Sequence, residues 1–322
     1  MPPPARNTVA RTRQRLRDHA ATLTPAVRGL FWAAASGAIF CFLNALMRGL
    51  AQQLPPLQTQ FLRYLFGLVV LLPLLLLRAG PAAYRPQSPM GQFARGAVHT
   101  LGLVLWFMAL PHIPLADTTA IGFTGPLFIM IGAAAFLREP MHWERWLATA
   151  IGFCGVLIVL GPKLGLGGGG SGGYHLLMLA SAPVFAASFL ITKVLTRTET
   201  TGVIVFWQAL TVTAFSLPMA LWVWQAPSAL QWLGFMLCGA LGSGGHYCLT
   251  RSFRVADISS TQSVKFLDLI WATALGWLLF ADLPAQTTLL GGVVISAATL
   301  WVARREQRRG ATPTIRDSVA PP

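Results

Sequence analysis

The amino-acid sequence predicts an all-α integral membrane protein of ten transmembrane helices, built as two inverted repeats of five helices each. Three observations predict this fold class: an apolar composition, a regular succession of long apolar segments, and a one-sided distribution of Lys and Arg. Hydrophobic residues make up 54% of the 322 residues and charged residues only 11%, with a mean hydropathy of +0.59. A water-soluble domain of this length is much less apolar. Ten spans of about 20 residues use about 200 residues, which excludes a large catalytic domain outside the bilayer.

The ten spans follow one another with short loops between them. We expect them over residues 29–50, 58–77, 93–111, 118–137, 143–161, 176–195, 203–224, 230–249, 258–280 and 286–303. The first segment is too long for the apolar core of a signal peptide, so we interpret it as a span. The arginine-rich tail before it, residues 1–28, has a mitochondrial presequence as its alternative interpretation.

Proline and aspartate mark particular spans. Pro73, Pro183 and Pro218 lie inside the second, sixth and seventh spans, where a missing backbone N–H kinks a helix. Asp117 and Asp257 stand at the start of the fourth and ninth spans. Because an aspartate before a helix accepts bonds from its first N–H groups, both are interpreted as N-caps.

Lys and Arg are concentrated in alternate loops. With the N-terminus in the cytoplasm, the inside loops carry Arg78, Arg85, Arg95, Arg138, Arg145, Lys193, Arg197, Arg251 and Arg254. The outside loops hold only Lys163, with Arg48 at the end of the first span. Since cytoplasmic loops carry the excess of Lys and Arg, we expect both termini in the cytoplasm and the chain in the inner membrane of a bacterium. Topology also accounts for the net charge of +14, so nucleic acid is not an expected partner.

A glycine-rich stretch divides the chain into two halves. Residues 163–173, KLGLGGGGSGG, have the composition of a linker. They separate a first repeat at 29–162 from a second at 174–303, and a basic tail at 304–322 ends the chain. Because five spans are an odd number, the second copy must insert upside down, and the charge bias of equivalent loops does reverse between the halves. Inverted repeats are typical of transporters.

Several segments resemble a known family. They are RYLFGLVVLLPLLLL in the second span, ALPHIPLADTTAIGFTGPLFIMIGAAAFLREPMHWERWLATAIGFCGVLIVLGP across the fourth and fifth, and SFRVADISSTQSVKFLDLIWATALGWLLFADLP around the ninth. The chain resembles the drug/metabolite transporter superfamily, and within it the ten-helix transporters of EamA type. The resemblance rests in the first half on Pro126, Glu139, Gly152 and Gly155. In the second half Asp282 stands where the family usually has Glu. The resemblance implies export or exchange of small organic metabolites such as amino acids.

The ninth span holds a charged pair within the membrane. Lys265 and Asp268 lie about 10 and 15 Å from its cytoplasmic end at the rise of an α-helix, and they share a face with Gln262 and Thr261. One interpretation is an internal ion pair that only orients the helix. The other, which we favour because each such charge is costly in a bilayer, is a cavity lining. Lys265 would then be available to an anionic group, and Asp268 to an ammonium group or a coupling proton.

The fourth span contains a helix break at the corresponding depth. Gly122, Gly125 and Pro126 interrupt an otherwise apolar segment. Interrupted helices at matching positions of two repeats predict a binding site near the membrane midplane, and a packing kink is the alternative.

Other polar and aromatic residues within the spans complete the candidate set. Arg63 has two interpretations. It either binds an anion or acts as a gate, or its side chain extends to the outer membrane–water interface. His99 and Asn44 are candidate hydrogen-bond partners or ligands, and His99 could also exchange the coupling proton. Trp106 and Trp271 could pack in the core or stack on a planar substrate. A further histidine, His246, is expected at the inner interface.

These features favour a secondary active transporter that moves small organic metabolites, chiefly amino acids, outward by alternating access. A passive channel is the first alternative, and an intramembrane enzyme is less favoured because the chain has neither HExxH nor GxSxG. We expect no catalytic residue, no cofactor and no metal, since the four cysteines lack CxxC spacing. The expected partners are a small-molecule substrate, the lipid bilayer and protons as coupling ions. No pattern selects an oligomeric state.

Overall fold

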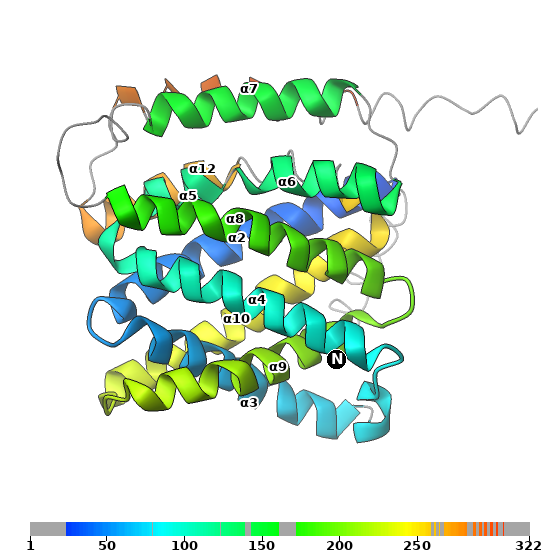
Figure 1. Cartoon of the computed structure of the whole chain (residues 1–322), viewed down its shortest axis with the longest axis vertical. Helices are drawn as coiled ribbons and strands as arrows, with labels where there is room; N and C mark the ends of the chain where they lie inside the picture. The colour runs from blue at the N-terminus through cyan, green and yellow to red at the C-terminus, as the bar shows by residue number, and fades with distance from the viewer. Residues whose placement is uncertain are drawn as a thin grey trace, which may run out of the picture.

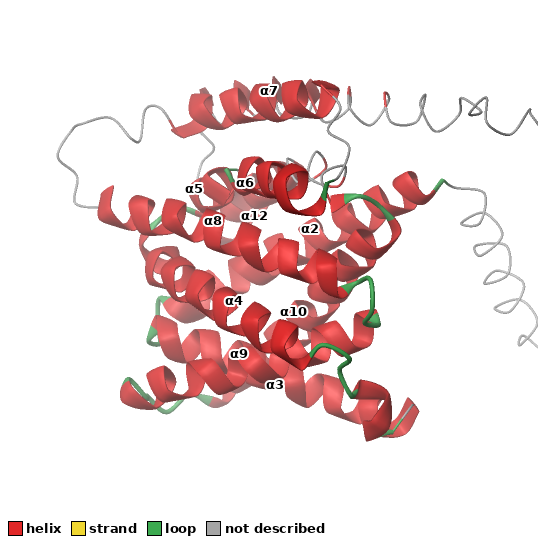
Figure 2. Ribbon diagram, turned by 45° about the vertical axis from the view of Figure 1, so that its right-hand side comes forward, coloured by secondary structure: helices red, strands yellow, loops and turns green. Residues whose placement is uncertain are grey.

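The computed structural model describes a helical protein. The described residues are 24–78, 80–122, 124–138, 143–160, 172–258, 261, 264 and 267–281, with 286–287, 290–291, 293–294, 297–298, 301 and 305 near the C-terminus. Helices account for most of them, and within these ranges no strand occurs (Figure 2).

The first half of the chain forms helices close to the expected spans. They are α2 (Pro25–Ala51), α3 (Pro56–Arg78), η1 (Pro81–Tyr84), α4 (Pro89–Ala109), η2 (Leu110–His112), α5 (Leu115–Gly122), α6 (Gly125–Gly132), the π-helix η3 (Ala133–Leu137) and α7 (Trp143–Leu160). Local signals explain the start of α2, because the Thr24 side chain accepts a bond from the N–H of Val27 and Pro25 follows the cap.

The second half repeats this pattern. Its helices are α8 (Gly172–Leu195), α9 (Thr201–Trp222), α10 (Ala229–Val255) and α12 (Asp268–Phe280). Thr200 caps α9 by accepting from the N–H of Val203. Ser228 and Gln231 form a capping box at the start of α10.

Length and hydropathy identify membrane spans directly. Among the described residues, four segments are long and apolar enough to cross a bilayer: Pro25–Ala51, Pro89–His112, Gly173–Leu195 and Thr201–Trp222. The prediction of a helical membrane protein is therefore confirmed at this level.

One charge lies in a different place from that expected. Arg95 was assigned to a cytoplasmic loop, but α4 begins at Pro89, so Arg95 lies within the helix and is only 2% exposed. Proline favours the first turn of a helix because its lost N–H has no partner there. The helix therefore starts four residues before the apolar segment that marks the span.

The helices are stacked across the long axis of the molecule, with α3 and α9 at one end and α7 at the other (Figures 1 and 2). Between them, α2 packs against α10, and α4 packs against α8. The main apolar cluster lies where these pairs meet α3, and it includes Leu43, Met47, Leu62, Phe107 and Phe235.

The packing partners of the two halves correspond. The contact of α2 with α10 matches that of α8 with α4, and the contact of α12 with α2 matches that of α6 with α8. In addition, α12 has 13 residues, as many as the eight of α6 and the five of η3 together. Both helices end at a residue in the left-handed region, Arg138 with φ 55° and Ala281 with φ 54°.

Candidate functional site

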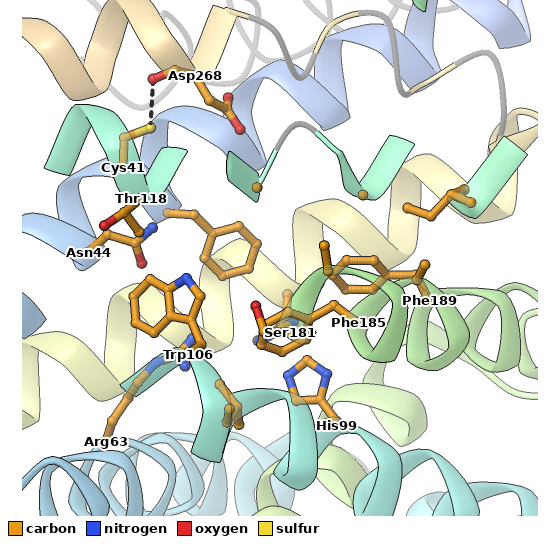
Figure 3. A pocket seen from close by; sticks show the side chains of 18 of the residues that line it. Cys41, Asn44, Arg63, His99, Trp106, Thr118, Ser181, Phe185, Phe189 and Asp268 are labelled. Carbon is orange, nitrogen blue, oxygen red and sulfur yellow. Dashed lines mark hydrogen bonds between the residues drawn. The ribbon is translucent and has the colours of Figure 1, made fainter. Parts of the chain in front are cut away.

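A cavity of about 220 Å³ lies in the middle of the helix stack. Its walls come from α2, α3, α4, α5, α6, α8, α10 and α12, so that both halves of the chain contribute (Figure 3). Seven of the residues predicted for the site line it: Asn44, Arg63, His99, Trp106, Gly122, Gly125 and Asp268.

One wall is the interruption between α5 and α6. After α5 ends at Gly122, the backbone N–H of Thr124 donates to the carbonyl of Ile121 at 3.0 Å, and its hydroxyl donates to the same oxygen at 2.8 Å. Then α6 starts at Gly125, with Pro126 in its first turn. A Cβ on either glycine would meet no atom of the described residues within 4 Å. The two glycines therefore leave the backbone at the break open to the cavity.

The wall next to the break is formed where α12 meets α2 and α5. Asp268 is the first residue of α12, and its carboxylate points toward the cavity (Figure 3). The Sγ of Cys41 donates to the backbone oxygen of Asp268 at 3.2 Å. A carboxylate in the first turn is stabilised by the positive end of the helix dipole. Lys265 and Gln262 lie outside the described residues.

Arg63 supplies positive charge from α3. Its side chain is 7% exposed, and its guanidinium carbon lies 4.6 Å from the ring centroid of Tyr64. No atom of the described residues accepts a hydrogen bond from its Nε. The interpretation of an arginine that extends to the membrane surface is wrong, because the buried guanidinium borders the cavity instead.

Aromatic rings line the cavity between these charges. Phe185 and Phe189 of α8 lie with their ring centroids 6.3 Å apart and their planes 17° from parallel. Trp106 lies on the α4 side, and Asn44 lies near it (Figure 3). These rings offer an apolar face to an organic molecule, since aromatic side chains stack on planar groups.

Trp271 does not belong to the cavity. It is half exposed on α12 and is absent from the described lining. Three residues rotate an α-helix by about 300°, so Trp271 points about 60° away from Asp268. Because α12 packs mainly on α2 and α5, that rotation carries the indole to the outside.

A buried network of polar side chains lies beside the cavity. The Tyr64 hydroxyl lies 3.0 Å from Nε2 of His99 and 3.2 Å from Nε2 of His246. The Nδ1 of His99 lies 3.0 Å from the Ser188 hydroxyl, and Nε2 of His246 lies 3.2 Å from the amide nitrogen of Gln208. Through His99, α4 is thereby joined directly to α3 and α8. It is joined indirectly, by way of Tyr64 and His246, to α10 and α9.

The sequence reasoning placed His246 at an interface, and this was wrong. His246 is 6% exposed and lines the cavity. It lies deeper because α10 continues to Val255, beyond the expected end of that span. Tyr64, Ser188 and Gln208 were missed altogether. Their only signal was a polar group within an apolar span, which must find a hydrogen-bond partner inside the protein.

Comparison with known proteins gives a consistent set of relatives. The sequence matches the EamA-like transporter family over residues 27–161 and again over residues 173–304. A riboflavin transporter from Rhizobium johnstonii is 34% identical, over 89% of this chain and 95% of that protein. An S-adenosylmethionine uptake transporter from Rickettsia prowazekii is 26% identical, over 88% and 94%. A pseudopaline exporter from Pseudomonas aeruginosa is 27% identical, over 87% and 97%.

One solved structure has the same fold. It superposes with a TM-score of 0.70 at 18% sequence identity, covering 89% of this chain and 99% of the other. At that identity the likeness concerns the fold alone.

Proposed function

The chain belongs to the EamA-like transporter family, and we propose that it is a secondary active transporter that carries a small organic metabolite across a bacterial inner membrane by alternating access. The resemblance seen in the sequence is thus confirmed, and the chain is a membrane transporter for metabolites and not an enzyme. The mechanism, the direction of transport and the kind of substrate are the proposed part.

Alternating access is supported by the correspondence of the two halves. The family match occurs twice, the helix contacts of the halves pair up, and α12 equals α6 and η3 in length. On this basis the ten spans form two inverted repeats, at 29–162 and 174–303, with both termini in the cytoplasm. Two mirrored halves around one site can exchange conformations and so open it to either side.

The observation that carries the proposal is the placement of opposite charges around one cavity. Asp268 borders it from α12 and Arg63 from α3, with Trp106 and Phe185 between them (Figure 3). The half-buried carboxylate of Asp268 favours a cationic group of a ligand, and the buried guanidinium of Arg63 favours an anionic one. This arrangement supports a substrate that carries an ammonium and a carboxylate group, such as an amino acid or a related compound.

Transport by purified protein in liposomes tests the proposal. The full chain is reconstituted, and influx and efflux of amino acids, riboflavin and S-adenosylmethionine are followed by mass spectrometry. Saturable exchange of a few compounds is expected, and efflux faster than influx supports export. Flux that does not saturate with any of these compounds, and that shows no exchange, would indicate the passive channel. Flux of none of them would overturn the proposal for these substrates.

A variant of Asp268 tests the site itself. We expect Asp268→Asn to lower exchange by about tenfold or more, because a charge-assisted contact with a cationic group is lost. Asp257→Asn is the matched control, since Asp257 lies outside the cavity lining and Asn caps a helix as well as Asp. Wild-type exchange by a folded Asp268→Asn protein would remove Asp268 from the mechanism.

A further inference from the structure

A chain of buried hydrogen bonds connects Arg95 with the cavity. Its guanidinium donates through Nη1 to the carbonyl of Ile204 at 2.9 Å, through Nε to the Thr192 hydroxyl, and through Nη2 to Oε1 of Gln208. The amide nitrogen of Gln208 then reaches His246. All these side chains are nine-tenths or more buried. Water therefore does not compete for the bonds, and the direction of each one matters.

The donor-to-acceptor direction of these hydrogen bonds determines the protonation state of His246. A guanidinium only donates hydrogen bonds, so Gln208 must present its oxygen to Arg95 and its N–H group to the histidine. The facing Nε2 of His246 must then accept, which means that it carries no proton. A proton there would oppose the N–H of Gln208. His246 is therefore held as the neutral imidazole with its proton on Nδ1.

His99 stands between two hydroxyl groups. Its Nε2 faces Tyr64 and its Nδ1 faces Ser188, each at 3.0 Å. A hydroxyl can donate or accept, so both partners suit a neutral and a protonated imidazole. When His99 is neutral, Tyr64 donates to Nε2. When His99 is protonated, Nε2–H donates to Tyr64, whose own O–H can then turn toward the cavity that Tyr64 lines. The heavy atoms need not move between these states.

From these bond directions, and resting on the transport role proposed above, we propose that His99 is the residue that takes up and releases a coupling proton, with Tyr64 as its relay to the cavity. In uptake, Tyr64 gives its hydroxyl proton to Nε2 of His99 and is reprotonated by a hydronium ion in the cavity, which leaves as water. In release, the two transfers reverse. Tyr64 is suited to this because it lines the cavity while bonded to both imidazoles. Arg95 and Gln208 are positioning residues that keep His246 out of the titration.

The charges around His99 govern when it takes the proton. Arg95 lies one helical turn earlier on α4 and shares its face, and Arg63 borders the same cavity from α3. Both oppose a second positive charge. The groups packed on His99 from α8, Phe185 and Phe189, are uncharged. Across the cavity lies the carboxylate of Asp268. Uptake is therefore favoured when negative charge, from Asp268 or from a bound substrate, approaches His99.

Histidine NMR tests the assignment without any transport. The full-length protein, with ¹⁵N-labelled histidine, is placed in lipid nanodiscs and titrated from about pH 5 to pH 9, the range in which histidines change charge. Spectra of His99→Gln and His246→Gln identify the two signals. Because burial and the charges of Arg95 and Arg63 oppose protonation, we expect the His99 signal to begin to titrate only at the acid end of this range, and the His246 signal to keep the pattern of a neutral ring protonated at Nδ1. A titrating His246, or a His99 that stays neutral throughout, would overturn the proposal.

Flux measurements test the role in coupling. Substrate exchange at equal pH and accumulation driven by an imposed pH gradient are compared for wild type, His99→Gln and Tyr64→Phe. Because both residues line the cavity, we expect the variants to lower exchange at equal pH to some extent and to lose the gradient-driven part by a much larger factor. His112→Gln is the control, because His112 is an exposed histidine stacked on Tyr174. Gradient-driven accumulation that persists in His99→Gln overturns the proposal. Loss of exchange and of accumulation to the same extent also overturns it, because it would assign His99 to substrate binding. A wild-type protein without exchange would refute the transport role, and the NMR titration would still decide the proton site.

Discussion

Gly37 of α2 lies directly against the carboxylate of Asp268, so closely that a Cβ on Gly37 would overlap Oδ1. The missing side chain makes the space that the carboxylate occupies at the start of α12. One turn further along α2, Cys41 bonds to the backbone of the same residue. The position of the carboxylate in the cavity thus depends on α2 as much as on α12.

Gly37→Ala should therefore change transport more than stability. The added methyl group pushes the carboxylate aside, and because this is the end of a movable side chain, the fold accommodates the change. We expect KM to rise by about tenfold, the loss of one good polar contact, with a similar melting temperature. Gly49→Ala on the same helix is the control, since no atom in the described part of the chain lies within 4 Å of its added Cβ. An unchanged KM in Gly37→Ala would show that substrate does not use this carboxylate.

A second glycine contact concerns stability. Gly239 of α10 packs on the backbone of α3, where an added Cβ would lie 2.6 Å from the N of Gly67 and 2.7 Å from the O of Phe66. Backbone atoms inside a helix have little room to move. We expect Gly239→Ala to lower the free energy of unfolding by about 1–3 kcal/mol through overpacking, measured by thermal denaturation in detergent. Gly244→Ala, with open space around its added Cβ, should melt no earlier than wild type.

Helix positions could be predicted from local sequence, because apolar length, prolines and capping residues act within a few residues of one another. Thr24 and Ser228 illustrate this, as each caps the helix that follows it. Arg95 shows where such reasoning ends. The charge-bias argument counted it with the inside loop, whereas its three acceptors lie on α8 and α9, about a hundred residues away in sequence. A charge with distant partners has no local signature.

The candidate site divides in the same way. Charges and glycines inside apolar spans, such as Asp268, Arg63 and Gly125, stand out in the sequence because each is costly or unusual there, and all three border the cavity. Tyr64 and Ser188 did not stand out, since a single hydroxyl is common in transmembrane helices. Their importance comes from bonds to His99 that only the packing of α3, α4 and α8 creates.

Arg95 should be sensitive even to a change that keeps its charge. Lysine lacks the planar fork and the reach to donate to Thr192, Ile204 and Gln208 together. We expect Arg95→Lys to lower the free energy of unfolding by about 2 kcal/mol or more, because buried acceptors lose their donors, again measured by thermal denaturation. The exposed Arg85 provides the control, and Arg85→Lys should have little effect. Equal melting of the two variants would mean that the fork contributes no stability.

The two tryptophans predicted for the site should behave differently. Trp106 lines the cavity, whereas Trp271 is half exposed on the outer side of α12. Removing a ring that stacks on substrate costs about 0.5–1.5 kcal/mol beyond the lost area, so we expect Trp106→Ala to raise KM several-fold. Trp271→Ala should leave KM near the wild-type value, because its indole lies outside the cavity lining. Both are measured by concentration-dependent exchange in liposomes, with equal protein incorporation checked for each variant. A larger change for Trp271→Ala would place the substrate outside the cavity described here, on the lipid-facing side of α12.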